Sequence, residues 1–144
     1  MRLLIHTDGA ARGNPGPAGA GAVLRDVVSG AIVAEIAEPL GRATNNVAEW
    51  AAVRFALEEA RRLGATHVDL RMDSELVARQ INGIYRVKHP DLKPIHAAVM
   101  ELLRAFDGYT VSHVPRELNK DADRLSNVAI DGGSTGAAYD RTRP

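Results

Sequence analysis

Four acidic residues could supply a shared site at the ends of neighbouring elements: Asp8, Glu49, Asp73 and Asp123. Each stands at the end of an apolar run or near the start of an amphipathic one. Asp121 is so close to Asp123 that position alone does not choose between them. Carboxylates that gather at one place raise each other's pKa unless a cation neutralises them. Brought together, these residues predict a site for a hard divalent cation and metal-assisted cleavage of a phosphodiester.

Each carboxylate also has an ordinary explanation when it is taken singly. Asp8 precedes Gly9, where aspartate commonly supports a turn. Glu49 follows the predicted N-cap residue Asn46 by three positions, which is the spacing of a capping box. Asp73 and Asp123 lie near predicted helix N-termini, where negative charge is favourable. The predicted site therefore depends on the fold bringing these residues together.

Hydrophobic periodicity and turn-forming residues predict five strands and four helices. Strands are expected over residues 2–8, 19–28, 31–40, 67–72 and 109–114. Helices are expected over residues 46–63, 75–82 (capped by Ser74), 92–104 and 118–131. Residues 9–17 and 85–90 are rich in Gly, Pro and polar side chains, and these segments are expected to be loops.

The order of these elements predicts an α/β fold with a mixed sheet. The first three strands are expected to be antiparallel and the later ones parallel, with helices covering the faces. In such sheets, binding sites form beyond the carboxyl ends of the parallel strands. Residues 2–8 and 67–72 would both end there, which brings Asp8 and Asp73 to one edge. With no cysteine and no evident histidine pair, the oxygen ligands favour Mg²⁺, with Mn²⁺ as the alternative.

Length and composition describe an ordinary globular chain. Its 144 residues are 45% hydrophobic and 25% charged, with no net charge, which favours a single domain. The absence of cysteine excludes a disulfide scaffold and suits the cytoplasm. No apolar run approaches the roughly 20 residues that cross a bilayer, so no membrane partner is expected. The domain is predicted over residues 1–131, followed by a flexible tail or truncated linker over 132–144.

Four sequence blocks, in order, resemble those of the ribonuclease H type 1 family. They are TDGAARGNPGP at residues 7–17, GRATNNVAE at 41–49, MDS at 72–74 and NKDADRL at 119–125. The resemblance spans residues 1 to about 130. It implies the ribonuclease H fold, a five-stranded mixed sheet flanked by helices, and it selects Asp123 over Asp121 because the family's aspartate follows an alanine.

The resemblance also implies an activity. A family member of this kind is an endoribonuclease that hydrolyses the RNA strand of RNA/DNA hybrids and leaves 5′-phosphate and 3′-hydroxyl ends. Two Mg²⁺ ions bound with the substrate would serve the reaction, with Mn²⁺ as an alternative. Asp8, Glu49, Asp73 and Asp123 would be both the catalytic and the metal-binding residues. Asp8 would contact both ions, and the protein is expected to act as a monomer.

Seven positions match substrate contacts of the family: Gly9, Ala10, Asn14, Arg42, Thr44, Asn45 and Asn46. The resemblance implies that the first three contact ribose 2′-hydroxyls, the groups that distinguish RNA from DNA. The next two would bind a phosphate of the DNA strand, and the last two would lie in the groove. Because phosphate contacts carry no base information, cleavage should be nearly independent of sequence.

The sequence departs from many relatives at two places, which predicts a minimal form of the enzyme. The loop before the last helix is short and lacks the family's mobile histidine; Arg116 or Glu117 occupies that position, and His113 is expected to be structural. Residues 85–93 offer a weak substitute for the basic protrusion of some relatives, so hybrid affinity should be modest and sensitive to salt.

Two other functions are compatible with some of these features. Another metal nuclease or a strand-transferase of the same fold would share the carboxylates without needing the block at residues 13–16. A non-catalytic hybrid-binding module would gain nothing from four acidic groups, because unneutralised acids repel a polyanion. Titration with Mg²⁺ separates cutting from binding alone.

Overall fold

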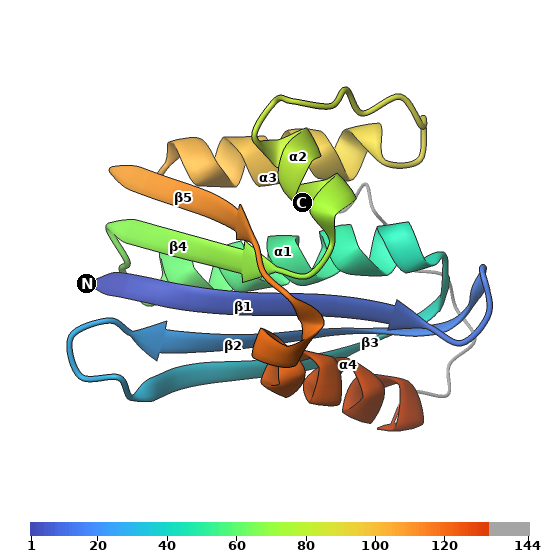
Figure 1. Ribbon diagram of the computed structural model, residues 1–144, viewed down its shortest axis with the longest axis horizontal. Helices are drawn as coiled ribbons and strands as arrows, with labels where there is room; N and C mark the ends of the chain where they lie inside the picture. The colour runs from blue at the N-terminus through green and yellow to red at the C-terminus, as the bar shows by residue number, and fades with distance from the viewer. Residues whose placement is uncertain (133–144) are drawn as a thin grey trace.

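The computed structural model describes residues 1–132, and five strands within them form one mixed sheet (Figure 1). The strands are β1 (Arg2–Ala11), β2 (Gly16–Asp26), β3 (Ile32–Ala43), β4 (His67–Met72) and β5 (Gly108–His113). Their order across the sheet is β3-β2-β1-β4-β5. β1, β2 and β3 are antiparallel neighbours, whereas β4 runs parallel to β1 and β5 parallel to β4. This topology confirms the predicted mixed sheet.

The helices cover the two faces of the sheet unequally. They are α1 (Asn45–Arg62), α2 (Glu75–Ile81), α3 (Lys93–Arg104) and α4 (Lys120–Gly132), with a 3₁₀ turn, η1 (Arg116–Leu118), before α4. α4 lies across β1, β2 and β3 on one face, while α1 contacts β1 and β2 and α3 packs against α1 (Figure 1). None of the helices within the described residues is long and apolar enough to cross a membrane.

The core lies between the sheet and α1, and α3 packs against α1 and adds buried residues to the core. Leu3 and Ile5 alternate along β1, and both are fully buried. They face the apolar side of α1, where Trp50, Val53 and Leu57 follow the three- and four-residue spacing of a buried helix face. Burial of this apolar surface holds α1 to the sheet and so fixes where the first turns of α1 lie.

The predicted end of the first strand was too early, because β1 continues to Ala11. Antiparallel pairing with β2 persists through Ala11, opposite Ala18. Parallel pairing with β4 ends at Thr7, opposite Met72. Residue 8 is therefore still in a strand, yet it is the first residue past the carboxyl end of the parallel pair. Residues 9–17, predicted as one loop, contain the end of β1, a short turn and the start of β2.

Two helix starts also differ from the prediction. Thr44, not Asn46, caps α1: its hydroxyl accepts a hydrogen bond from the Val47 N–H at 3.2 Å. Glu49 is consequently in the second turn, and the capping-box explanation for it is wrong. The last helix begins at Lys120 instead of residue 118, because residues 116–118 form the separate turn η1. Ser74 caps α2 as predicted. Of the predicted tail, Gly132 ends α4, and residues 133–144 lie outside the described residues.

Candidate active site

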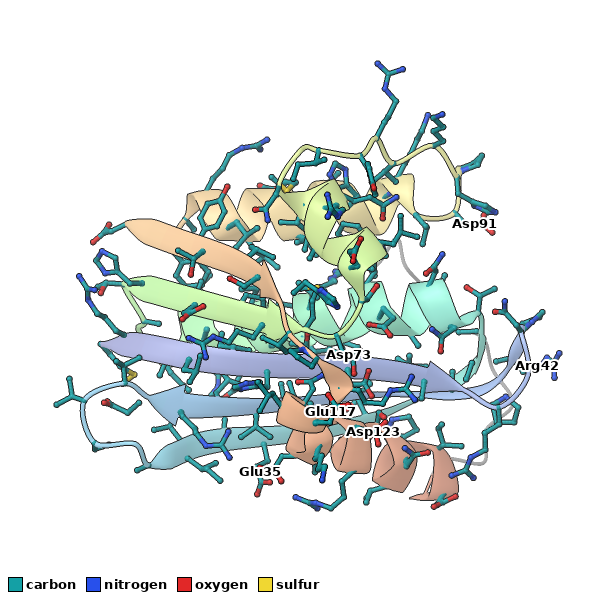
Figure 2. All side chains as sticks on the ribbon, viewed as in Figure 1. Glu35, Arg42, Asp73, Asp91, Glu117 and Asp123 are labelled. Atoms are coloured by element: carbon teal, nitrogen blue, oxygen red, sulfur yellow. The ribbon has the colours of Figure 1, made fainter. Side chains whose placement is uncertain are left out.

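Three of the four predicted carboxylates meet at the edge where β1 and β4 stop pairing. One carboxylate oxygen from each of Asp8, Glu49 and Asp73 lies within 4.8 Å of the others. Asp8 comes from β1, Glu49 from α1 and Asp73 from the residue after β4. Asp123, in the first turn of α4, lies near enough to Asp8 to raise the pKa of that carboxyl. Figure 2 shows Asp73 and Asp123 turned toward the same central region of the sheet.

Glycines in β1 and β2 allow the two helices to approach closely enough for this convergence. A Cβ on Gly9 would overlap the backbone of Ala48 and Glu49 in α1. A Cβ on Gly21, the residue opposite Asp8 in β2, would overlap the Ala122 carbonyl of α4. Glu49 therefore reaches the site from one face of the sheet and Asp123 from the other. The glycine that follows Asp8 is explained by helix packing as well as by its predicted substrate contact.

Asp8 is almost completely withdrawn from solvent, at 5% exposure. Its pKa is raised to about 8, first by burial, then by the negative charge of Asp73, and then by the hydrogen bond with Asp123 and its charge. A hydrogen bond from Ser126, whose Oγ lies 3.4 Å from Asp8 Oδ2, opposes the rise. Ionisation of Asp8 at neutral pH is therefore unfavourable without an added positive charge.

The carboxyl of Glu49 is also hard to ionise, and its pKa is raised further than that of Asp8. Burial is the largest cause that raises its pKa to about 9, followed by the charges of Asp8 and Asp73. The positive charge of Arg116, from η1, acts in the opposite direction. Arg116 lies in the short segment before α4, and its charge acts on a carboxylate of the cluster.

The donor set fits a hard divalent cation. It offers carboxylate oxygens within 4.8 Å of one another and no sulfur or nitrogen ligand. The two most buried members have raised pKa values, first because they are buried and then because negative charges face each other, and a bound cation would offset that cost. The residues present therefore fit a divalent metal ion.

The structure separates the two aspartates that position alone left equivalent. Asp121 Oδ2 accepts a hydrogen bond from Arg25 at 2.9 Å and forms an ion pair with it. Asp123 instead interacts with Asp8. Its amide N–H donates to the Asn119 carbonyl oxygen at 3.1 Å in the first turn of α4. Asp123 is therefore the member that faces the cluster.

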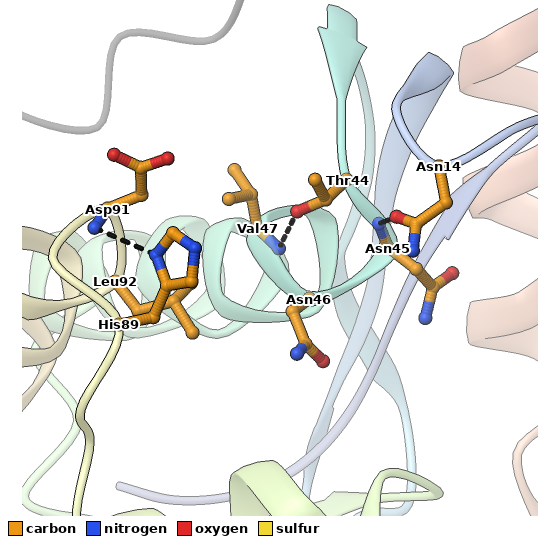
Figure 3. Close-up of a pocket in the computed structure, with 8 residues that line it drawn as sticks. All are labelled: Asn14, Thr44, Asn45, Asn46, Val47, His89, Asp91 and Leu92. Carbon is orange, nitrogen blue, oxygen red and sulfur yellow. Dashed lines mark hydrogen bonds between the residues drawn. The ribbon is translucent and has the colours of Figure 1, made fainter.

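A groove of about 480 Å³ lies at the N-terminal end of α1, and it contains four of the seven predicted substrate contacts (Figure 3). It is lined by Asn14, Thr44, Asn45, Asn46, Val47, His89, Asp91 and Leu92. Asn14 Oδ1 accepts a hydrogen bond from the Asn45 N–H at 3.0 Å, which ties the 12–15 turn to α1. Thr44 also caps α1, so its hydroxyl has a structural role in addition to the predicted one.

The other three predicted contacts lie outside that groove lining. Gly9 and the half-buried Ala10 belong to the end of β1, beside the carboxylates. Arg42 is exposed near the end of β3, and Figure 2 shows it at the margin of the molecule, away from Asp73 and Asp123. The predicted contacts therefore line a surface that extends from the carboxylates toward that margin.

Sequence reasoning assigned no role to two residues that contact the site. Ser126 is fully buried and donates toward Asp8, and Asn119 is 1% exposed and donates to the Thr7 carbonyl oxygen at 2.8 Å. Asn119 stands in a motif block, which could have directed attention to it. His113 ends β5, and its exposed ring has Nδ1 3.9 Å from Glu75 Oε2. The segment between α2 and α3 has no additional helix.

The sheet topology and the carboxylates at its edge define the ribonuclease H class of fold. A family model described as reverse transcriptase-like matches residues 6–129. Ribonuclease HI of Halobacterium salinarum is 46% identical over 130 residues, which cover 90% of this chain and 65% of that protein. A bifunctional protein of Mycobacterium tuberculosis is 44% identical over 140 residues, covering 97% of this chain and 38% of that one.

Solved structures give the same result. The N-terminal ribonuclease H domain of that mycobacterial protein superposes with a TM-score of 0.88 at 44% identity, covering 91% of this chain and all of that one. LC11-RNase H1 in complex with an RNA/DNA hybrid has a TM-score of 0.84 at 42% identity, covering 90% of this chain and 96% of that one. The chain belongs to the ribonuclease H type 1 family, and it spans 38% to 65% of the length of these two curated relatives.

Proposed function

We propose that this domain is an endoribonuclease that hydrolyses the RNA strand of RNA/DNA hybrids. The observation that carries the proposal is the cluster of Asp8, Glu49 and Asp73, whose carboxylate oxygens lie within 4.8 Å of one another, with Asp123 near enough to raise the pKa of Asp8. Support comes from relatives named ribonuclease HI and from a relative solved with an RNA/DNA hybrid. The products would carry 5′-phosphate and 3′-hydroxyl ends.

The four carboxylates would hold the divalent ions, with Asp8 central because it contacts members from both sides. When bound, such ions neutralise the cluster, act as Lewis acids toward the phosphate and lower the pKa of water. The protein's own residues provide the frame: α1 and α4 hold Glu49 and Asp123 against β1 from opposite faces. We expect Mg²⁺ to be the preferred ion because the ligand set is all oxygen, with Mn²⁺ as an alternative.

Recognition of the hybrid would rest on the groove at the start of α1 and on the end of β1. Exposed amides of Asn45 and Asn46 can donate to and accept from both bases and sugars. Gly9, Ala10 and Asn14 would contact ribose 2′-hydroxyls, while Arg42 and Thr44 would bind a DNA phosphate. Contacts of these kinds read the type of strand and not its bases, so cleavage would be nearly independent of sequence.

The test uses one end-labelled RNA presented single-stranded, paired to RNA and paired to DNA. Each form is incubated with Mg²⁺, with Mn²⁺ or with EDTA, and Asp73→Asn serves as the matched inactive protein. Internal cuts confined to the DNA-paired RNA and abolished by EDTA are expected. Cutting of a DNA strand would indicate another nuclease or strand-transferase of this fold, and hybrid binding without any cut would indicate a binding module.

All four carboxylates belong to one chain, which supports a monomer as the active unit. Light scattering after size-exclusion chromatography tests this, and a dimer at micromolar concentration would contradict it. We further propose the cytoplasm as its compartment, since a chain of 144 residues without cysteine suits reducing conditions. Fractionation of cells of the source organism tests the compartment, and recovery outside the cytoplasmic fraction would contradict it.

A further inference from the structure

Asn119 connects the backbone beside one carboxylate to the backbone of another. Its side-chain Nδ2 donates a hydrogen bond to the Thr7 carbonyl oxygen at 2.8 Å, one residue before Asp8. Its own carbonyl oxygen accepts from the Asp123 N–H at 3.1 Å. The residue is 1% exposed, so this link between β1 and the start of α4 is shielded from water. Buried hydrogen bonds of this kind are costly to break.

The orientation of the Asn119 amide is fixed by its partner. A carbonyl oxygen can only accept, so the amide nitrogen must face Thr7. Asn119 Oδ1 has no hydrogen-bond partner among the described residues, and neither has His6 Nδ1. Both residues line a cavity of about 160 Å³, but the two atoms themselves have almost no exposed surface. The hydrogen bond to Thr7 alone therefore sets the orientation of the amide.

The surface beneath α4 explains why such a link is needed. Added Cβ atoms at Gly19 and Gly21 would overlap α4 backbone atoms, so α4 rests directly on two residues that have no side chain. Glycines allow close approach, but they have no side chain that would resist a shift of the helix along its axis. At the end of α4 that carries Asp123, two polar contacts hold the helix to the sheet: the buried hydrogen bond from Asn119 to Thr7 and the more exposed ion pair between Arg25 and Asp121. The Ser126 contact with Asp8 is longer, at 3.4 Å.

We propose that Asn119 is a positioning residue that sets where Asp123 stands relative to Asp8. It would act through Asp123 and touch neither substrate nor ion. The inference rests on the proposed nuclease function, because turnover is the property that depends on the spacing of these carboxylates. Small displacements of catalytic groups reduce rates strongly, by about 100-fold for roughly 1 Å.

The test compares Asn119→Ala with Asn82→Ala. Asn82 is the control for the loss of one amide-to-carbonyl hydrogen bond, because its Nδ2 also donates to a strand carbonyl oxygen, that of Val111, at 2.9 Å, although Asn82 is exposed and Asn119 is buried. Both variants should lower the Tm by a few degrees. Asn119→Ala should lower kcat on a hybrid about 10- to 100-fold with KM within about threefold, whereas Asn82→Ala should keep kcat within about twofold.

A double-mutant cycle shows whether Asn119 acts through Asp123. In an Asp123→Asn background, Asn119→Ala should reduce the residual kcat by less than about twofold. Hydrogen exchange at the amides of residues 121–124 should be faster in Asn119→Ala than in Asn82→Ala. If Asn119→Ala fails to fold, Asn119→Leu, which keeps the branched side-chain skeleton and lacks the donor, takes its place in every comparison.

Two outcomes would overturn the inference while leaving the nuclease function intact. One is a kcat for Asn119→Ala within about threefold of that for Asn82→Ala. The other is that Asn119→Ala lowers kcat by the same factor in the Asp123→Asn background as in wild type. A wild-type protein that cuts no hybrid would overturn the nuclease function instead. The hydrogen-exchange comparison would still report whether Asn119 holds the first turn of α4.

Discussion

The carboxylate cluster and the groove at the start of α1 solve different problems with different residues. The cluster consists of acidic side chains, two of them buried and two half-buried, and its members come from β1, α1, the end of β4 and α4. The groove is open, and four of its eight lining residues have amide or hydroxyl side chains, three of them consecutive, Thr44, Asn45 and Asn46. The carboxylate cluster therefore depends on contacts between elements that are far apart in the sequence. The hydrogen-bonding groups of the groove come mainly from one turn and its neighbours.

The largest expected effect comes from neutralising a member of the cluster. Asp8→Asn or Asp73→Asn should lower kcat on a hybrid by at least about 1,000-fold, because each removes a charged oxygen ligand that no neighbour can replace. Single-turnover cleavage of end-labelled hybrid measures the change, and Asp121→Asn serves as the control outside the cluster. Activity of Asp8→Asn within tenfold of wild type would contradict the assignment.

The next effect comes from pushing α4 away from the sheet. Gly21→Ala places a methyl group against the Ala122 carbonyl oxygen, so α4 must shift and carry Asp123 with it. We expect kcat to fall at least about tenfold, with about 1–3 kcal/mol lost from the free energy of unfolding. Gly132→Ala is the control, since a Cβ there meets no atom within 4 Å. Unchanged turnover in Gly21→Ala would show that the approach of α4 does not matter.

A smaller effect is expected in the groove. Asn45→Ala and Asn46→Ala should raise KM about 3- to 10-fold with kcat within about twofold, because each removes a hydrogen bond worth about 0.5–1.5 kcal/mol. Arg42→Ala should reduce the slope of log affinity against log salt concentration by about 0.7–0.9, as loss of one phosphate contact does. Steady-state kinetics and salt titrations measure both. A loss of kcat as large as that of Asp73→Asn would erase the distinction between the two regions.

The last expected effect is on stability and not on turnover. The folded pKa values of Asp8 and Glu49, about 8 and about 9, exceed the values near 4 of unfolded carboxyls. The folded state therefore binds more protons than the unfolded state across this range. Without metal, the contribution of these groups to the free energy of unfolding should fall as pH rises from about 4 to 9.

Mg²⁺ should reverse that loss, because it binds the folded carboxylates. At pH 9, saturating Mg²⁺ should raise the Tm by about 5 °C, and by much less at pH 5. Asp8→Asn in EDTA should have a higher Tm than wild type at pH 9, since it removes a buried charge. Thermal unfolding followed by circular dichroism gives these values. Equal Mg²⁺ stabilisation at both pH values would argue against a buried cluster with raised pKa.

Local patterns in the sequence were sufficient for the elements and for most of the cluster. The alternation over residues 67–72 and the spacing of Trp50, Val53 and Leu57 report which face of each element is buried, and burial of that face follows from the hydrophobic effect. Asp8 and Asp73 could be placed at one edge because parallel strands end together. The resemblance to ribonuclease H supplied the choice of Asp123.

Tertiary contacts determined the helix cap, the raised pKa values and the long-range hydrogen bond, which local sequence patterns do not encode. Thr44 and Asn46 are both competent caps, and only the backbone path out of β3 determines that Thr44 is used. The raised pKa values of Asp8 and Glu49 depend on burial by elements remote in the chain. The bond from Asn119 to Thr7 joins residues 112 positions apart. Periodicity acts over a few residues, whereas carboxylate spacing, burial and charge depend on distances through space, which the folded packing alone sets.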